Sequence, residues 1–244
     1  MNGRVIWRAL SADADGNITK ERHGNDAVTT RTYSPSLSLL ESVETESGGQ
    51  IIQSLQYAYD QNQNLLRRRD MLTEVQQTFG YDELNRLIQD ETCDGSVCAL
   101  ASYEYDRRGN IRHQSALGEL SYVGHKVILA GDQSFSYNDI GNQVSRDDTT
   151  ITYTGFNKPR SIAAPGLKME ISYDAFGRRV HKGVPDQKRE TFYFGSDYRR
   201  DLAGDRETYR LLVHASGRVV AVVTKEDTNN DVFTIHEDGL GSSD

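Results

Sequence analysis

Large apolar side chains recur at every second position along this chain, in short runs that polar and glycine-containing turns interrupt. In the stretch YEYDRRGNIRH, for example, Tyr103 and Tyr105 stand two residues apart and would share one face of an extended strand. Helical spacing is confined to one weak candidate, Leu37 to Val43. The pattern therefore predicts an all-β chain.

A Tyr-Asp motif ends many of these runs. Two variable residues follow the acid, and then a turn residue and a polar or basic residue. The acid can accept hydrogen bonds from nearby main-chain N–H groups, and Gly or Asn four residues after the tyrosine tolerates a positive φ, so each copy predicts a β-hairpin. The copies are Tyr59-Asp60, Tyr81-Asp82, Tyr105-Asp106 with Gly109, Tyr137-Asn138 with Gly141, Tyr153-Thr154 and Tyr173-Asp174 with Gly177, and residues 14–18 are a degenerate relative.

The repeated motif indicates architecture rather than a catalytic site. Asp106 and His113 suggest a general acid/base pair, but the other copies have no counterpart of His113. Ordering about 20 residues costs on the order of 20–40 kcal/mol of backbone entropy, whereas each buried large side chain returns roughly 1.5–3 kcal/mol. One hairpin therefore cannot stand alone, and we predict antiparallel β-hairpin repeats that wind into a spiral sheet.

The spacing of apolar residues changes after about residue 185, where the Tyr-Asp copies stop. Four further strands are predicted at residues 191–195, 209–213, 218–224 and 232–235. We expect three regions: a degenerate repeat with partial strands (1–50), the repeat array (51–185) and a strand-rich tail (186–244).

Composition removes several classes of function. The chain has 28 Lys and Arg against 36 Asp and Glu, and its net charge of −8 opposes binding to the phosphate backbone of a nucleic acid. The longest apolar run, residues 219–223, is too short to span a bilayer and predicts a buried strand. The first ten residues lack the apolar segment of a signal peptide.

The two cysteines stand on either side of a predicted hairpin turn. Cys93 and Cys98 flank Asp94-Gly95, a strong turn signal that would bring the two sulfurs together. The sequence leaves a disulfide and a pair of free thiols equally open, and two cysteines without clustered histidines are too few for a zinc site.

The order of these motifs resembles that of the Rhs or YD-repeat family of bacterial proteins over roughly residues 50–242. The repeated Tyr-Asp motif carries the resemblance first, and Tyr193-Phe-Gly195 followed by residues 217–223 carries it next. The last stretch, residues 235–242, is similar to the signature at the entry to the family's core segment, with Gly239 where the family tends to have His. Its motif residues are His236, Asp238, Leu240, Gly241 and Ser242.

The resemblance implies a structural function. In that family the repeats form a hollow shell around a C-terminal toxin, so this chain would be a wall segment of a secreted or cell-envelope-associated protein. Its partners would be the rest of the shell and the enclosed toxin domain. Because the chain ends before the family's autoproteolytic and toxin regions, we expect an open, truncated fragment that self-associates through unpaired strand edges.

Other functions are weighed against this one. A carbohydrate- or cell-surface-binding module would need Tyr57, Tyr103 and Tyr153 exposed in a row, and a non-functional truncated remnant is a further alternative. A glycosidase or a self-cleaving protease would need grouped catalytic residues that the sequence does not offer, so we predict that the chain is not an enzyme and needs no cofactor.

Metal and acid/base sites are also disfavoured. Residues 13–17 and 227–231 resemble the start of a calcium loop, but Ile18 and Val232 occupy the sixth position, where such a loop needs Gly. His236 and Asp238 would share one face of a strand, and we interpret them as a packed hydrogen-bonded pair rather than a ligand pair.

Overall fold

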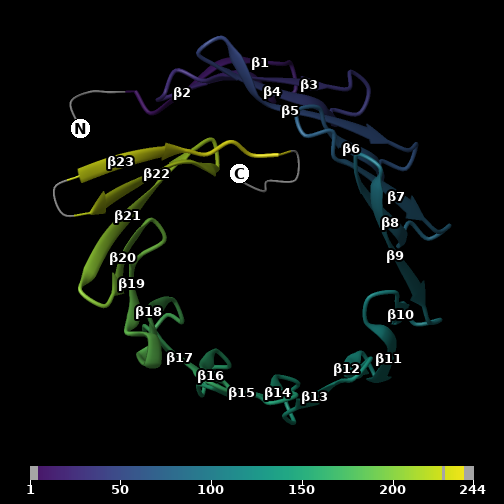
Figure 1. The fold of residues 1–244 in the computed structure, drawn as a ribbon, viewed down its shortest axis with the longest axis vertical. Helices are drawn as coiled ribbons and strands as arrows, with labels where there is room; N and C mark the ends of the chain where they lie inside the picture. Colours follow the sequence, from purple (N-terminus) through teal and green to yellow (C-terminus); the bar gives the residue numbers. More distant parts are fainter. Residues whose placement is uncertain (1–4, 227–228, 239–244) are drawn as a thin grey trace. The chain divides into compact units, whose positions relative to one another are not determined.

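The computed structural model describes residues 5–226 and 229–238, which contribute 23 strands to one antiparallel sheet (Figure 1). Strands that follow each other in sequence pair antiparallel from β1 to β10 and again from β11 to β21. A 3-10 turn, η1 (Pro185–Gln187), is the one helical element in the described residues. The prediction of an all-β chain of antiparallel hairpin repeats is confirmed.

The first ten strands lie in the N-terminal half of the chain. Their bounds are β1 (Trp7–Ala12), β2 (Ile18–His23), β3 (Val28–Tyr33), β4 (Leu40–Ser47), β5 (Gln50–Tyr59), β6 (Leu65–Asp70), β7 (Gln76–Tyr81), β8 (Leu87–Asp94), β9 (Val97–Tyr105) and β10 (Ile111–Gln114). The weak helical candidate at residues 37–43 is therefore wrong, because β4 begins within it.

The remaining strands follow the same meander. Their bounds are β11 (Gly118–Val123), β12 (Lys126–Ala130), β13 (Gln133–Tyr137), β14 (Gln143–Arg146), β15 (Thr149–Tyr153), β16 (Pro159–Ala164), β17 (Leu167–Tyr173), β18 (Arg179–Val184), β19 (Arg189–Phe194), β20 (Tyr198–Ala203), β21 (Arg206–Ala215), β22 (Arg218–Glu226) and β23 (Asn229–Thr234). The tail thus holds five strands where the sequence predicted four. The missed strand, β20, is rich in charged residues and is held by pairing with β19 and β21 on its two sides.

The chain divides into two compact units. Unit 1 comprises Met1–Ala116, Ala215–Ala221 and Thr234–Asp244, and unit 2 comprises Leu117–His214 and Val222–Phe233. Unit 1 therefore contains β1 to β10 together with two short segments from near the C-terminus. None of the helices in the part of the chain that the structure describes is long and apolar enough to cross a membrane.

The same five-residue turn joins the two strands of each repeat hairpin. In the copy that begins at Asp60, the Asp60 N–H donates to the Asn64 carbonyl at 2.9 Å and the Gln63 N–H donates to the Asp60 carbonyl at 3.1 Å. The fourth residue takes a positive φ, which is 68° at Gln63 and 87° at Gly109. Among the described residues, this pair of bonds begins at Asp13, His23, Asp60, Asp82, Asp106, Asn138, Thr154 and Asp174.

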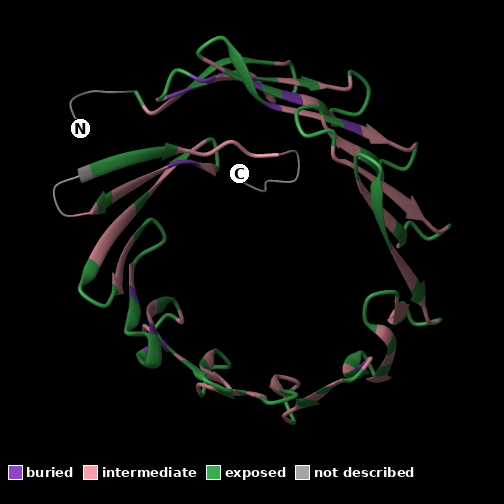
Figure 2. Ribbon diagram, in the orientation of Figure 1, coloured by how far each residue is buried: buried purple, intermediate pink, exposed green. Residues whose placement is uncertain are grey.

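Few side chains are fully buried, as expected for a single layer of strands (Figure 2). In unit 1 the buried positions lie mainly on β2 to β5, and charged and polar residues such as Glu21 and Thr45 are among them. Val220 and Ala221, within the predicted buried strand, are fully buried. A buried glutamate requires partners for its charge, and these partners define the site described below.

Cys93 and Cys98 form a disulfide, which decides between the two states that the sequence left open. The two residues lie directly opposite each other on β8 and β9. The disulfide therefore ties together the two strands of one hairpin.

Candidate functional site

The polar residue that follows each repeat tyrosine is bound to its own turn. Asp60 Oδ1 accepts hydrogen bonds from the N–H groups of Asn62 and Asn64, both at 2.8 Å, and Oδ2 accepts one from Asn64 Nδ2 at 2.9 Å. These hydrogen bonds hold the pKa of Asp60 below its ordinary value, and the bond from the Asn64 side chain has the largest effect. A basic side chain can take the same place, since Arg86 Nε donates to Asp82 Oδ2 at 2.7 Å.

Four of the repeat tyrosines bind the repeat before them. The hydroxyl groups donate to main-chain carbonyls that directly follow the preceding turn: Tyr81 to Leu65 at 3.0 Å, Tyr105 to Leu87 at 2.6 Å, Tyr153 to Gln143 at 2.7 Å and Tyr173 to Pro159 at 2.9 Å. A phenylalanine would offer the same ring but no donor. The motif therefore has a physical reason to be Tyr-Asp: the tyrosine links two hairpins and the acid closes its own turn.

Neighbouring turns also contact each other through side chains. Asn64 Nδ2 donates to Asn85 Oδ1 at 2.8 Å, and Asn142 Nδ2 donates to Asn157 Oδ1 at 2.7 Å. The Arg86 guanidinium lies 4.4 Å from the ring centre of Tyr105. Within each unit, neighbouring repeats are thus joined by both main-chain and side-chain contacts.

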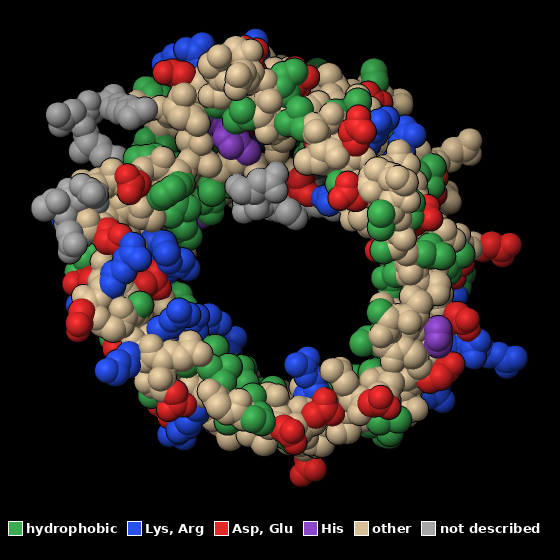
Figure 3. Space-filling model, viewed as in Figure 1, with side chains coloured by type: hydrophobic (Ala, Val, Ile, Leu, Met, Phe, Trp, Pro, Cys, Tyr) green, Lys and Arg blue, Asp and Glu red, His purple; other side chains and the backbone are tan. Residues whose placement is uncertain are grey.

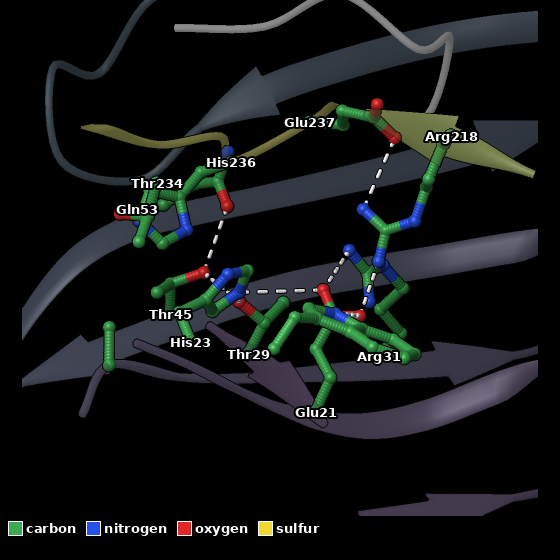
Figure 4. A network of polar contacts seen from close by, with 12 residues as sticks. Glu21, His23, Thr29, Arg31, Thr45, Gln53, Arg218, Thr234, His236 and Glu237 are labelled. Carbon is green, nitrogen blue, oxygen red and sulfur yellow. Dashed lines mark hydrogen bonds and ion pairs between the residues drawn. The ribbon is translucent and has the colours of Figure 1, made fainter. Parts of the chain in front are cut away.

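A charge cluster of Glu21, His23, Arg31, Arg218 and Glu237 lies in unit 1 (Figure 4). Glu21, on β2, is fully buried, and its Oε1 lies 2.9 Å from Arg31 Nη2. Its Oε2 accepts hydrogen bonds from Trp7 Nε1 at 2.9 Å and from Arg218 Nη2. Arg218 also lies 3.2 Å from Glu237, so the cluster fastens the C-terminal segments of unit 1 to β2 and β3.

The charges of the cluster stabilise one another. Burial by itself would raise the pKa of Glu21, but His23, Arg31 and Arg218 outweigh it and hold the pKa far below its ordinary value. Burial would likewise lower the pKa of Arg218, but Glu21 and Glu237 raise it above the ordinary value. Glu21 and Arg218 are therefore both charged at neutral pH and held as a structural ion pair.

A row of polar side chains continues from the cluster. His23 Nε2 lies 3.0 Å from Thr29 Oγ1, which lies 2.8 Å from Thr45 Oγ1, and Thr45 in turn donates to Gln53 Oε1 at 3.0 Å. The rings of His23 and His236 meet edge to face with their centres 4.5 Å apart. The row crosses β2, β3, β4 and β5 and so supports the position of the C-terminal segment.

The described part of the core-entry motif belongs to this region. His236 Nε2 lies 3.2 Å from Thr234 Oγ1, and Asp238 Oδ2 lies 2.5 Å from Arg68 Nη1 on β6. The two residues thus contact different partners, and they lie beyond the end of β23 rather than within a strand. Leu240, Gly241 and Ser242 lie outside the described residues.

A cavity of about 390 Å³ adjoins the charge cluster and is lined by Arg31, Tyr33, Arg218, Glu237 and Asp238, among others. Arg31 and Arg218 point their charges at Glu21, and Asp238 is paired with Arg68. The ionised groups of the cavity are thus engaged in ion pairs between segments of unit 1.

Sequence reasoning missed Glu21, Arg31 and Arg218 as members of one site. Glu21 and His23 alternate with Lys20 and Arg22 along β2, which reads as an ordinary polar strand. Nothing in the local sequence signals that Glu21 meets Arg218, 197 residues later in the chain.

The residues that would serve glycan stacking do not form an exposed row. Tyr57 is 7% exposed, and Tyr103 and Tyr153 are half-buried. Residues 13–17, the first candidate calcium loop, form a repeat-like turn in which Asp13 accepts hydrogen bonds from Asp15 and Asn17. The second candidate begins at Asp227, which lies outside the described residues.

Comparison with known proteins identifies relatives of the whole chain. The family model for the teneurin YD-shell matches residues 11–228. Toxin subunit YenC1 of Yersinia entomophaga is 27% identical over 267 residues, which cover 95% of this chain and 26% of YenC1.

Two solved structures share the fold. The crystal structure of TcdB2-TccC3 matches 100% of this chain and 15% of its own at 18% identity, with a TM-score of 0.79. The Photorhabdus luminescens Tc holotoxin pore matches 98% of this chain and 14% of its own, also at 18% identity and a TM-score of 0.79. The chain therefore spans about a quarter of YenC1 and about a seventh of the matched structures.

Proposed function

This chain belongs to the teneurin YD-shell family, and from that membership we infer that it is a wall segment of a β-shell that encloses and presents a toxin domain. The partners of the segment are the rest of the shell and the enclosed domain. The protein acts outside the cell that makes it, or at that cell's envelope.

The observation that carries this proposal is the tyrosine ladder, in which the hydroxyl of one repeat binds the main chain of the repeat before it. Such contacts add hairpins side by side without a compact core, and that is the construction a wall needs. We assign the Tyr-Asp residues an architectural role on the same ground.

The proposed link to toxin delivery is supported by the relatives. YenC1 is a toxin subunit, and the matched structures come from TcdB2-TccC3 and a Tc holotoxin. Because this chain spans only part of each of them, the enclosed domain would belong to the remainder of the parent protein.

The segment itself is proposed to have no catalytic role. The ionised groups of the charge cluster are committed to structural pairs, and the repeat acids are committed to their own turns. A chemical reaction would need some of these groups to exchange partners.

The experiment uses the native protein that contains this segment, with an affinity tag inserted between Pro165 and Gly166, in the turn between β16 and β17 where open space surrounds Gly166. The purified protein is treated with a broad-specificity protease before and after the shell is unfolded by urea, and the particle is imaged by cryo-electron microscopy. We expect a hollow particle with an internal domain that resists the protease until the shell unfolds. A solid particle, or an attached domain digested at the same rate in both states, would refute enclosure.

A further inference from the structure

We propose that unit 2 carries a docking surface for an extended polypeptide in which acidic and apolar side chains alternate at every second position, on one face of the segment. The surface, which we term the basic groove, has a floor of Ile162, Met169 and Ile171 and cationic side chains from Lys158, Arg179 and Lys182, and its volume is about 810 Å³. The proposal does not depend on whether the shell encloses a toxin.

The floor is continuous because its residues are paired across strands. Ile162 of β16 lies directly opposite Met169 of β17, and Ile171, two residues further along β17, lies opposite Lys182 of β18. Residues two apart share one face of a strand, so an aliphatic surface and a cation occupy the same side of the sheet. Figure 3 shows Lys and Arg side chains gathered beside hydrophobic ones in this part of the chain.

The cations of the groove lack carboxylate partners. Within the described residues, the side chains of Lys158, Arg179 and Lys182 take part in no ion pair, although Arg179 lies over the Tyr193 ring at 5.6 Å. Arg178, on the rim, differs because it is paired with Asp174 at 2.8 Å. The groove thus gathers three cations that no carboxylate of the described residues pairs with, although the chain as a whole carries a net charge of −8.

The next acid along this face is already engaged. Lys182 lies opposite Thr191 of β19, and Thr191 Oγ1 donates to Asp201 Oδ1 at 2.8 Å. Asp201 also lies 3.2 Å from Arg199 and 2.7 Å from Arg210. The groove therefore has an unmatched positive charge, which carboxylates of a partner would complement.

The dimensions fit a short extended segment. Four adjacent strands, β16 to β19, extend over roughly 14 Å at about 4.8 Å per strand spacing. Four or five extended residues cover that distance at about 3.3 Å per residue. Side chains two residues apart share one face of such a segment. A segment with the order acidic, polar, apolar, polar, acidic would therefore place its aliphatic group on the floor and its carboxylates beside the cations.

A polypeptide fits the groove better than a single-stranded nucleic acid does. Stacking of bases requires open aromatic faces, but the aromatic rings here are engaged. Arg179 covers Tyr193, and Phe156 meets Tyr173 edge to face with ring centres 6.0 Å apart. The floor is aliphatic. Ile162 and Met169 are half-buried and Ile171 is 8% exposed, so Ile162 and Met169 offer the apolar contact that leucine or valine side chains would use.

The test measures binding of a fluorescein-labelled ten-residue peptide to the full chain by fluorescence polarisation. In this peptide Glu and Leu alternate at the odd positions and Ser fills the even positions. The groove variant is Lys182→Glu. Its matched control is Lys168→Glu, which makes the same charge change on the opposite face of the same strands, where Lys168 is exposed and pairs with Glu170. A peptide with Lys in place of Glu and an oligothymidylate serve as alternative probes, and far-UV circular dichroism checks that both variants fold.

We expect Lys182→Glu to weaken binding of the acidic peptide about tenfold, with little change for Lys168→Glu, and we expect affinity to fall as salt rises. Arg179→Glu should weaken binding to a similar extent. Because Arg179 is exposed, this variant tests the groove even if Lys182→Glu fails to fold. Equal losses in the groove and control variants would overturn the proposal. So would equal binding of the Lys peptide, or tighter binding of the oligothymidylate.

Discussion

Tyr105 donates its phenolic hydroxyl to the main-chain carbonyl of Leu87 at a distance of 2.6 Å, and so joins one hairpin to the hairpin before it. Leu87 directly follows the turn that Asp82 closes, and Tyr105 directly precedes the turn that Asp106 closes. The bond thus links two successive hairpins close to their turns. It gives the tyrosine of the motif a function that its ring alone would not supply.

Loss of this hydroxyl should weaken the wall. We expect Tyr105→Phe to lower the free energy of unfolding by about 1 kcal/mol, because the Leu87 carbonyl loses its donor. The measurement is urea unfolding followed by far-UV circular dichroism. Tyr103→Phe is the matched control, since Tyr103 is a half-buried tyrosine in the same strand. Equal effects of the two substitutions would contradict the ladder.

The positive φ at the fourth residue of the turn should make this position sensitive to substitution of glycine. Gly109 has a φ of 87° and open space around its missing side chain, so Gly109→Ala should cost about 1 kcal/mol from backbone strain alone. Gly155 also has open space, but its φ lies outside the positive range. Gly155→Ala should therefore be neutral or slightly stabilising. Thermal unfolding of both variants tests this, and an equally destabilised Gly155→Ala would point to a cause other than φ.

The charge cluster should be sensitive to loss of its carboxylate. We expect Glu21→Gln to destabilise the chain by about 3 kcal/mol, because Arg31 would keep a largely buried charge without a carboxylate and Arg218 would keep only Glu237. Urea unfolding followed by the fluorescence of Trp7, which donates to Glu21, reports this region. The control is Glu226→Gln, whose carboxylate pairs with the exposed Arg206, and its effect should be much smaller. If Glu21→Gln unfolded at the same urea concentration as the unsubstituted chain, Glu21 would not hold these segments together.

Acid should loosen the repeat turns. The pKa of Asp60 is lowered in the folded chain by the Asn64 side chain and by main-chain donors. The ionised carboxylate therefore favours folding above the pKa of the unfolded chain, and this contribution is lost as the pH falls through the lower, folded value. Carbon-detected NMR titration should give Asp60 a pKa below 3.8, its ordinary value. A pKa at or above that value would mean that the turn bonds do not favour the charged form.

The repeats could be predicted from sequence because their signals are local. The acid at position one and the turn residue at position four of each turn lie within five residues of each other, and their chemistry dictates the hydrogen bonds observed at Asp60 and Asp106. The target of the tyrosine hydroxyl was not predictable, because it depends on the register between hairpins. Tyr105 and Leu87 are 18 residues apart and meet only once the sheet has formed.

The charge cluster could not be predicted for a similar reason. Glu21 and Arg218 are separated by 197 residues, and nothing in the sequence around either residue indicates that the two side chains meet. The strand β20 was missed because Arg199, Arg200 and Asp201 read as a polar loop, whereas pairing on both sides makes it a strand. Cross-strand partners thus override local composition at these positions.

The dependence of each hairpin on its neighbours is the central claim, and the isolated hairpin of residues 167–184 tests it most directly. In the chain, Ile171 and Lys182 lie opposite each other on β17 and β18. We predict that a synthetic peptide of these residues shows no nuclear Overhauser contacts between those two side chains in water and exchanges its amides at unprotected rates. A peptide that folds alone into the hairpin, with Ile171 against Lys182, would contradict the claim.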